Sequence, residues 1–153
     1  FFVRSSLPEY NKTARFEGLT SEIEIVRDTA NIPHILGKTD IASMFGLGYV
    51  HAQDRLWQMT MLRRTAQGRL SEILGQDKLK SDILVRRLGI YDAAQNSVLA
   101  LNPEIRKLLK SYTAGVNARL SEINANFVIL CLTAKTFGFK CSLINRIITS
   151  FPL

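Results

Sequence analysis

The stretch FGLGYVHAQDRLWQMTMLRRTAQGRLSEILG, residues 45–75, is the most informative feature of this chain. Several of its apolar residues recur at steps of three and four: Ala52, Leu56, Met59, Leu62 and Ala66. That spacing predicts one apolar stripe along an α-helix. Trp57 and Met61 lie on the opposite side of the same helix. Because such a helix needs partners on two faces, we expect more protein than the helices of this chain to cover it.

The start of this helix is expected at Asp40, whose carboxylate can cap the unpaired backbone N–H groups of the first turn. Gly46 and Gly48 follow inside the helix, and each weakens it by roughly 1 kcal/mol relative to alanine. Their presence predicts either close packing of another element or a break at this point.

A β-hairpin is predicted upstream of the helix. Residues 22–27 alternate between isoleucines and glutamates, as in a strand with one solvent-exposed face. Residues 28–31 are turn-like, and residues 32–36 form a second short apolar run. Pro33 in that run suits an edge strand or the start of a strand. Residues 1–20, which are largely polar and include Pro8 and Gly18, are expected to form an extended leader.

Helices are predicted from the end of the quoted stretch to Ile123. A short helix over residues 69–74 is expected to end at Gly75, and another over residues 82–101 is interrupted at Gly89. Asn102-Pro103-Glu104 is a strong helix start: a capping residue, proline at the first position and an acid in the first turn. The stripe expected to be buried in that last helix comprises Ile105, Leu108, Leu109, Tyr112, Val116, Leu120 and Ile123. The predicted fold class is α+β, an N-terminal hairpin followed by a mostly helical body.

The tail, residues 124–153, differs in character from the rest of the chain. It carries Lys135, Lys140 and Arg146 but no acidic residue, and its apolar residues come in clumps without a sustained period. The local cues do not agree with one another, unlike those upstream. We interpret this tail as anomalous sequence, of the kind that a frameshift, an intron read-through or a damaged gene would produce.

Composition narrows the class of protein. With 153 residues, 46% hydrophobic and 22% charged, the chain suits one folded domain and is too apolar for disorder. The net charge of +7 leaves open a stand-alone basic helical module that binds nucleic acid or an anionic membrane. The basic residues are scattered, however, and Arg63–Arg64 and Arg86–Arg87 are the densest spots. Solvated helix faces are therefore favoured, with no nucleic-acid partner, and no apolar run is long enough for a membrane span.

The residues alone offer no active site. His34 and His51 are the only histidines, and neither belongs to a zinc-binding HExxH pattern. Cys131 and Cys141 fit no metal or redox motif and are expected to be free or buried thiols. Glu72, Asp77 and Asp82 are expected to be ordinary polar residues of helices and loops, and no nucleophile elbow or phosphate-binding loop is present. We predict no catalytic, substrate-binding or metal-ligating residue in this chain, and no cofactor.

Ordered motifs nevertheless resemble one enzyme family. Ser6-Leu7-Pro8-Glu9-Tyr10 is followed by Ile25-Val26-Arg27-Asp28, by Asn31-Ile32-Pro33-His34-Ile35 and by Gly46 through Met59. Gly68-Arg69-Leu70-Ser71-Glu72 continues in register. Over residues 5–123 the chain resembles the start of the α-chain of penicillin acylase-type N-terminal-nucleophile amidohydrolases. Asn31 stands where the family has glycine, a mild departure because asparagine tolerates the left-handed conformation. The opening Phe1-Phe2-Val3-Arg4 is compatible with the end of a removed export segment.

The resemblance implies a precursor that cuts itself into α and β chains and folds as a four-layer αββα structure. The N-terminal serine of the β-chain would be the nucleophile, with its own α-amine as base. It also implies an exported, periplasmic parent enzyme, a calcium ion in the full-length parent, and two partners, the remainder of the α-chain and the β-chain. The substrates that the resemblance implies are penicillins, other N-acyl compounds or acyl-homoserine lactones, and the sequence does not choose between them.

Five polar residues are the most recognisable of the resemblance: Arg27, Asp28, Gln53, Asp54 and Arg55. One interpretation places them near an active cleft. The interpretation we favour is a hydrogen-bond and ion-pair network that joins the strand to the helix, because buried charges need paired partners.

Overall fold

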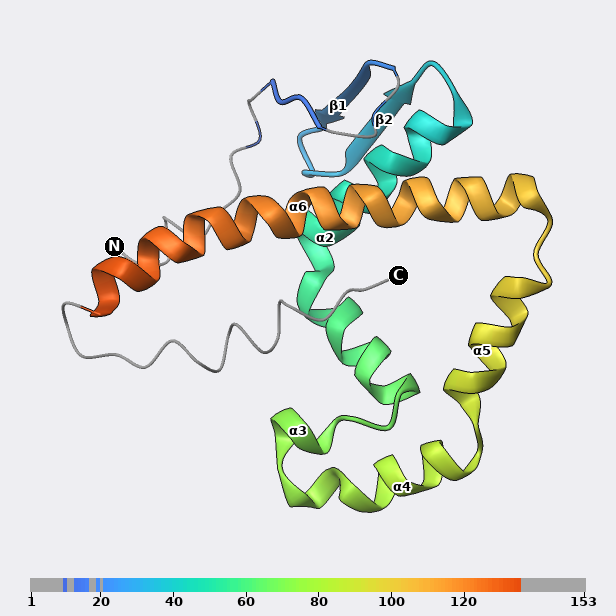
Figure 1. The fold of residues 1–153 in the computed structure, drawn as a ribbon. Coiled ribbons are helices and arrows are strands. Elements are labelled where there is room, and N and C mark those ends of the chain that lie inside the picture. Colours follow the sequence, from blue (N-terminus) through green and yellow to red (C-terminus); the bar gives the residue numbers. More distant parts are fainter. Residues whose placement is uncertain (1–9, 11–12, 17–18, 20, 136–153) are drawn as a thin grey trace.

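The computed structural model describes the backbone of residues 10, 13–16, 19 and 21–135, and the side chains of these residues as far as Ile123 (Figure 1). Two antiparallel strands are followed by helices. Helices α2 (Asp40–Ala66) and α6 (Pro103–Lys135) cross, with the hairpin on one side of α6 and helices α3 to α5 on the other. The predicted α+β class, a hairpin with a mostly helical body, is confirmed.

The hairpin consists of β1 (Ile23–Arg27) and β2 (Pro33–Gly37), paired from Ile23 opposite Gly37 to Arg27 opposite Pro33. The Asp28 carboxylate closes the turn by accepting hydrogen bonds from the backbone N–H groups of Ala30 (3.0 Å) and Ile32 (2.8 Å). Asn31 has φ 63°, the left-handed conformation for which asparagine is suited. Ile23 and Ile25 lie on the half-buried face, as the alternation predicts.

The N-cap of α2 is Thr39, so the expectation that Asp40 caps the helix was wrong. The Thr39 hydroxyl accepts a hydrogen bond from the backbone N–H of Ala42 at 3.2 Å. Asp40 is already the first helical residue and therefore supplies only a negative charge near the positive end of the helix dipole. Helix α2 is kinked at Arg55, where φ is −133° and ψ is 21°.

The crossing of α2 and α6 depends on two facing glycines. A Cβ on Gly48 would lie 2.0 Å from the Tyr112 carbonyl oxygen, and a Cβ on Gly115 would lie 2.0 Å from the Phe45 carbonyl oxygen. Gly46 serves the hairpin instead, since a Cβ there would lie 2.8 Å from Cγ2 of Ile35. Close packing, one of the two alternatives predicted for Gly46 and Gly48, is thus confirmed, and the break lies further along, at Arg55.

A small core fills the angle between the crossed helices. Ala52 of α2 is buried with Val116 and Leu120 of α6. Partly buried neighbours complete the cluster: Leu56, Met59, Tyr112 and Ile123. The stripe predicted to be buried in α6 is therefore right near the crossing and wrong further away, where Ile105 and Leu109 are exposed. In the stripe of α2, Leu62 is 63% exposed.

Short elements connect the two crossed helices: α3 (Ser71–Leu74), the 3-10 turn η1 (Gln76–Lys78), α4 (Leu79–Arg87) and α5 (Ile90–Leu99). Gly75 (φ 83°) ends α3 and Gly89 (φ 63°) separates α4 from α5, as predicted. No residue of α5 is buried. The start of α6 is also as predicted, since Asn102 Oδ1 accepts a hydrogen bond from the Glu104 N–H at 2.9 Å.

Helix α6 runs past Ile123 to Lys135, further than the predicted stripe. Residues 124–135 contain neither glycine nor proline, so nothing in their sequence ends the helix. The side chain of Cys131 and all of Cys141 lie outside the described residues, as does the opening segment 1–9, and the division of the chain at residue 124 stays a prediction. Among the described helices, none is long and apolar enough to cross a membrane.

Candidate functional site

The guanidinium of Arg27 joins the hairpin to α2. It donates to both carboxylate oxygens of Asp54, at 2.8 and 3.1 Å, and to Gln53 Oε1 at 2.8 Å. A further bond, of 3.0 Å, goes to the Asn31 carbonyl oxygen in the hairpin turn. The Arg27 side chain is 10% exposed and that of Asp54 is 30% exposed. The favoured interpretation, a network that ties strand to helix, is confirmed for these residues.

Two of the five motif residues stand outside this network. Asp28 is used within the hairpin turn, and the backbone N–H of Ile32 lowers the pKa of its exposed carboxyl. Arg55 lies at the kink of α2 and donates to Gln58 Oε1 at 3.2 Å. Asp28 and Arg55 are next to Arg27 and Asp54 in the sequence but do not join their network, because neighbouring residues on a strand or helix point in different directions.

Residues of the leader also reach the site. The Tyr10 ring covers the Arg27 guanidinium, with the central carbon 4.4 Å from the ring centroid. Phe16 packs against Phe45 and Tyr49 of α2, at centroid distances of 5.8 and 5.3 Å. The extended leader predicted for residues 1–20 thus contributes packing residues where it is described. The signal that could have found them is the presence of the aromatic residues Tyr10 and Phe16 in the largely polar residues 5–20.

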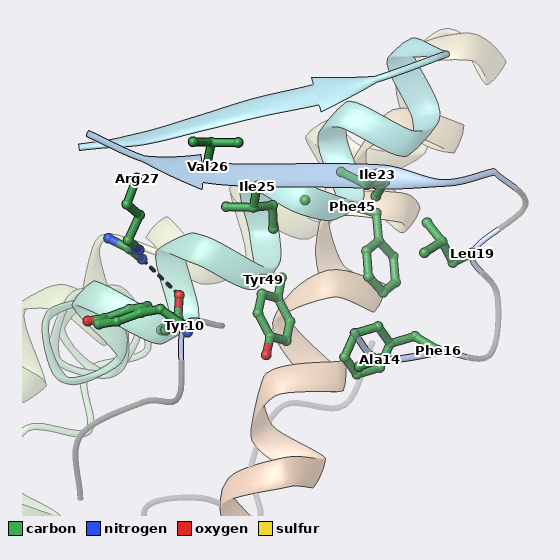
Figure 2. Close-up of a pocket in the computed structure, with 12 residues that line it drawn as sticks. Tyr10, Ala14, Phe16, Leu19, Ile23, Ile25, Val26, Arg27, Phe45 and Tyr49 are labelled. Atoms are coloured by element: carbon green, nitrogen blue, oxygen red, sulfur yellow. Dashed lines mark hydrogen bonds between the residues drawn. The ribbon is translucent and has the colours of Figure 1, made fainter. Parts of the chain in front are cut away.

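A cavity of about 380 Å³ lies between β1, α2 and the leader residues Tyr10, Ala14, Phe16 and Leu19 (Figure 2). In Figure 2, Ile23 and Ile25 point from β1 toward Phe45 and Tyr49, and Phe16 and Ala14 lie on the far side of these two rings. Arg27 and Gln53 supply the polar part of the lining. The cavity is large enough for a small molecule, and its described lining residues do not pair a nucleophile with a base.

The histidines are not part of this site. His51 Nδ1 lies 3.0 Å from the Tyr112 hydroxyl in the α2–α6 interface, and burial raises the pKa of that tyrosine. His34 lies 3.5 Å from an Asp28 oxygen on the exposed face of the hairpin. His51 is therefore a hydrogen-bonded structural residue. No group of three or more potential metal ligands is found among the described residues.

A second polar cluster surrounds α3 and includes Glu72 and Asp82, two of the residues that were expected to be ordinary polar residues of helices and loops. Arg64 is buried and donates to Glu72 at 2.7 Å, and Arg69 also donates to Glu72 at 2.7 Å. These hydrogen bonds, that from Arg69 foremost, lower the pKa of Glu72 although burial opposes them. Asp82 is buried and accepts from the backbone N–H groups of Leu70 (3.0 Å) and Ser71 (2.7 Å).

Asp82 therefore caps α3 from a different helix. Burial alone raises the pKa of Asp82, but hydrogen bonds from Ser71 and Leu70 and the charge of Arg86 outweigh it, so the pKa lies below its usual value. Nothing in the sequence spacing identifies Asp82 as this cap, because the contact depends on how α4 folds back on α3. The cluster is structural, since all of its carboxylates are occupied by donors of the same chain.

Comparison with known proteins identifies the family. Residues 22–143 match a model of the family described as penicillin amidase. Penicillin G acylase of Escherichia coli is 42% identical over 139 residues, covering 90% of this chain and 16% of that protein. Penicillin acylase 2 proenzyme of Pseudomonas sp. (strain SE83) is 40% identical over 119 residues, covering 78% of this chain and 15% of that protein. Acyl-homoserine lactone acylases of Pseudomonas species match at 32% to 38% identity.

A solved structure supports the same family assignment. A thermostable penicillin G acylase from Alcaligenes faecalis superposes with a TM-score of 0.64 at 28% identity, covering 88% of this chain and 77% of that one. The chain belongs to the penicillin amidase family, whose members are hydrolases of amide bonds. It spans between 13% and 16% of the length of the curated relatives. The family match ends at residue 143, inside the tail for which no match was expected.

Proposed function

We propose that this chain is a structural part of an amidohydrolase that hydrolyses the linear amide bond of penicillins or other N-acyl compounds. The observation that carries the proposal is the match of residues 22–143 to the penicillin amidase family. Relatives named as penicillin acylases and as acyl-homoserine lactone acylases support an N-acyl substrate without choosing between acyl groups.

Assembly from more than one chain is part of the proposal. This chain covers 77% of the matching chain of the Alcaligenes faecalis structure but only 16% of the Escherichia coli relative. That solved chain is therefore several times shorter than the curated relative, as expected for one product of a processed precursor. The word proenzyme in the name of the Pseudomonas relative supports the same organisation.

The chemistry would lie on the partner β-chain. Its N-terminal serine hydroxyl would attack the amide carbonyl carbon, and its own α-amine would take the proton, through a water molecule. Backbone donors would stabilise the oxyanion, and the amine would leave with a proton. Water would then hydrolyse the acyl-enzyme to release the carboxylic acid.

This chain would contribute the surface on which its partners assemble. Its exposed large apolar side chains include Trp57, which is 56% exposed, and Leu84, Leu88 and Leu99. Such side chains favour burial against further protein, and we propose that the remainder of the α-chain and the β-chain cover them. We also propose that the parent enzyme is periplasmic or secreted. Any calcium of the parent would require carboxylates beyond those described here, because these form no metal-binding cluster.

The alternative, a stand-alone basic module for nucleic acid or an anionic membrane, is not favoured by the family match. Its only support is the net charge of +7.

Reading the coding sequence on both sides of this stretch, in all three frames, tests the proposal. We expect one frame to continue into a segment headed by a serine that begins a β-chain. If no frame continues the family's sequence, the amidohydrolase assignment fails for this protein.

A further inference from the structure

The outer side of α4 combines apolar side chains with positive charges. Lys80, Leu84 and Leu88 follow one another at steps of four along this helix and its C-cap, so they form one row on its surface. Ile83 and Arg87 form the adjacent row at the same step. All five residues are exposed, Leu84 by 58% and Leu88 by 63%. We call these five residues the α4 face, and Figure 1 shows α4 at the end of the structure away from the hairpin.

The carboxylates near the α4 face are turned away from it. Asp82 lies on the opposite side of α4, where it is buried and accepts hydrogen bonds from two backbone N–H groups at the start of α3. Glu72 of α3 is occupied by two arginines. Within the part of the chain that the structure describes, no carboxylate forms an ion pair with Lys80 or Arg87. The α4 face therefore presents two cations without a negative partner, beside a row of exposed leucines.

The two ends of this chain do not suit the α4 face. Residues 124–153 contain no acidic residue, so packing them on the face would leave both cations unpaired. Burying an unpaired charge is costly. The described leader residues Tyr10 and Phe16 are anchored elsewhere, over Arg27 of the hairpin and against Phe45 of α2. A partner that brings carboxylates is therefore expected outside the 153 residues.

The lengths of the relatives favour the β-chain as the source of that partner. This chain covers 77% of the matching chain of the Alcaligenes faecalis structure but only 16% of the Escherichia coli relative. Most of the protein outside this chain therefore lies beyond the α-chain.

We infer that the α4 face binds an acidic, amphipathic segment of the β-chain. Carboxylates of that segment would pair with Lys80 and Arg87, and its apolar side chains would cover Leu84 and Leu88. Interfaces between protein chains commonly have this arrangement, with apolar contacts inside and complementary charges around them. This binding rests on the proposed function, because it requires a β-chain.

A carbodiimide joins a lysine amine directly to a carboxylate in contact with it and so reports the predicted pair. The test protein is a chimeric precursor, in which residues 21–123 replace the matching segment of Escherichia coli penicillin G acylase. After self-cleavage, mass spectrometry should find Lys80 joined to an aspartate or glutamate of the β-chain. Lys80→Arg keeps the charge but cannot be joined in this way, so this variant should lose that link and keep the others.

A matched pair of double variants measures the contribution of the charges. Lys80→Glu with Arg87→Glu reverses both cations of the α4 face. Lys107→Glu with Lys110→Glu makes the same change in net charge at two exposed positions of α6. The α4 variant should lower the urea concentration at which the α and β chains separate in size-exclusion chromatography by about 1 M, and the α6 variant should lower it by less than half as much. Unchanged circular dichroism of the 153-residue chain with either double substitution shows that it still folds.

The outcomes separate this inference from the proposed function. Equal losses in the two double variants, or no Lys80 link in a chimera whose chains stay together, would overturn the inference and leave the proposed function intact. A chimera that is never cleaved, or whose chains do not associate, would contradict the proposed function and the inference with it. Binding of the 153-residue chain to phosphatidylglycerol vesicles, lost on reversal of Lys80 and Arg87 and without any β-chain link, would assign the face to an anionic membrane and also overturn the inference.

Discussion

The Arg27–Asp54 pair is the contact whose energetic role can be tested most sharply. Arg27→Met removes all four hydrogen bonds of the guanidinium while it keeps an unbranched apolar stem under Tyr10. Asp54→Asn keeps the shape of the partner and one acceptor oxygen, but removes its charge. The two changes and their combination form a double-mutant cycle.

The magnitude follows from burial and from the number of bonds. A hydrogen bond to a charged group contributes about 1.5–3 kcal/mol when buried, but Asp54 is 30% exposed and regains water when its partner is removed. We therefore expect Arg27→Met to lower the free energy of unfolding by about 2–3 kcal/mol and Asp54→Asn to lower it by about 1 kcal/mol. The coupling energy between the two should be about 1–1.5 kcal/mol, above the typical value for a surface ion pair.

Urea unfolding, followed by far-UV circular dichroism and by fluorescence of Trp57, the single tryptophan, measures all four proteins. The cycle is repeated at high salt, where coupling should persist because the guanidinium is 10% exposed and is screened little. A coupling energy below about 0.3 kcal/mol, or one that vanishes at high salt, would show that the Arg27–Asp54 pair is an ordinary solvated contact that does not stabilise the fold.

Four further predictions address the rest of the fold. Gly48→Ala, which forces a methyl group onto the Tyr112 carbonyl oxygen, should lower the free energy of unfolding by about 2 kcal/mol in urea titrations. Equal losses in Gly48→Ala and Gly46→Ala, where the obstacle is a side chain, would contradict this crossing. Thr39→Ala should cost about 1 kcal/mol by the same assay, and a larger loss in Asp40→Ala would argue against Thr39 as the cap. Because the pKa of Asp82 is lowered in the fold, its contribution to stability is present at neutral pH and is lost as the pH falls below about 4. Asp82→Asn should therefore flatten the acid dependence of the free energy of unfolding. An unchanged dependence on pH would show that the cap does not form. Arg27→Ala at the matching position of a full-length homologue should reduce the self-cleaved fraction on gels without changing relative rates on different acyl groups, and normal cleavage with altered selectivity would contradict a structural role.

Local patterns predicted the elements of this fold well. Alternation over residues 22–27 predicted β1, and Asn102-Pro103-Glu104 predicted the start of α6 to the residue. These features depend on neighbours in sequence, so the sequence carries them directly. The cap at Thr39 was missed by one position, because Thr39 and Asp40 are both good capping residues and only the backbone conformation decides between them.

Contacts between elements were predicted less well. The buried stripe predicted for α6 was right at Val116 and Leu120, where α2 crosses, and wrong at Ile105 and Leu109, which are exposed. The capping role of Asp82 was not predicted, because its partners, the backbone N–H groups of Leu70 and Ser71, come close only after α4 folds back. Gly115, which faces Gly48 across the crossing, carried no local signal at all, because its role depends on a helix far away in sequence.

We propose that this chain is a structural part of an amidohydrolase and does not itself hydrolyse the substrate. The most direct test compares the isolated 153-residue chain with a chimera, in which residues 21–123 replace the matching segment of the Escherichia coli penicillin G acylase precursor. Release of carboxylic acid and amine from penicillin G is measured for both. We expect hydrolysis by the matured chimera and none by the isolated chain. Hydrolysis by the isolated chain at a rate above that of buffer would contradict it.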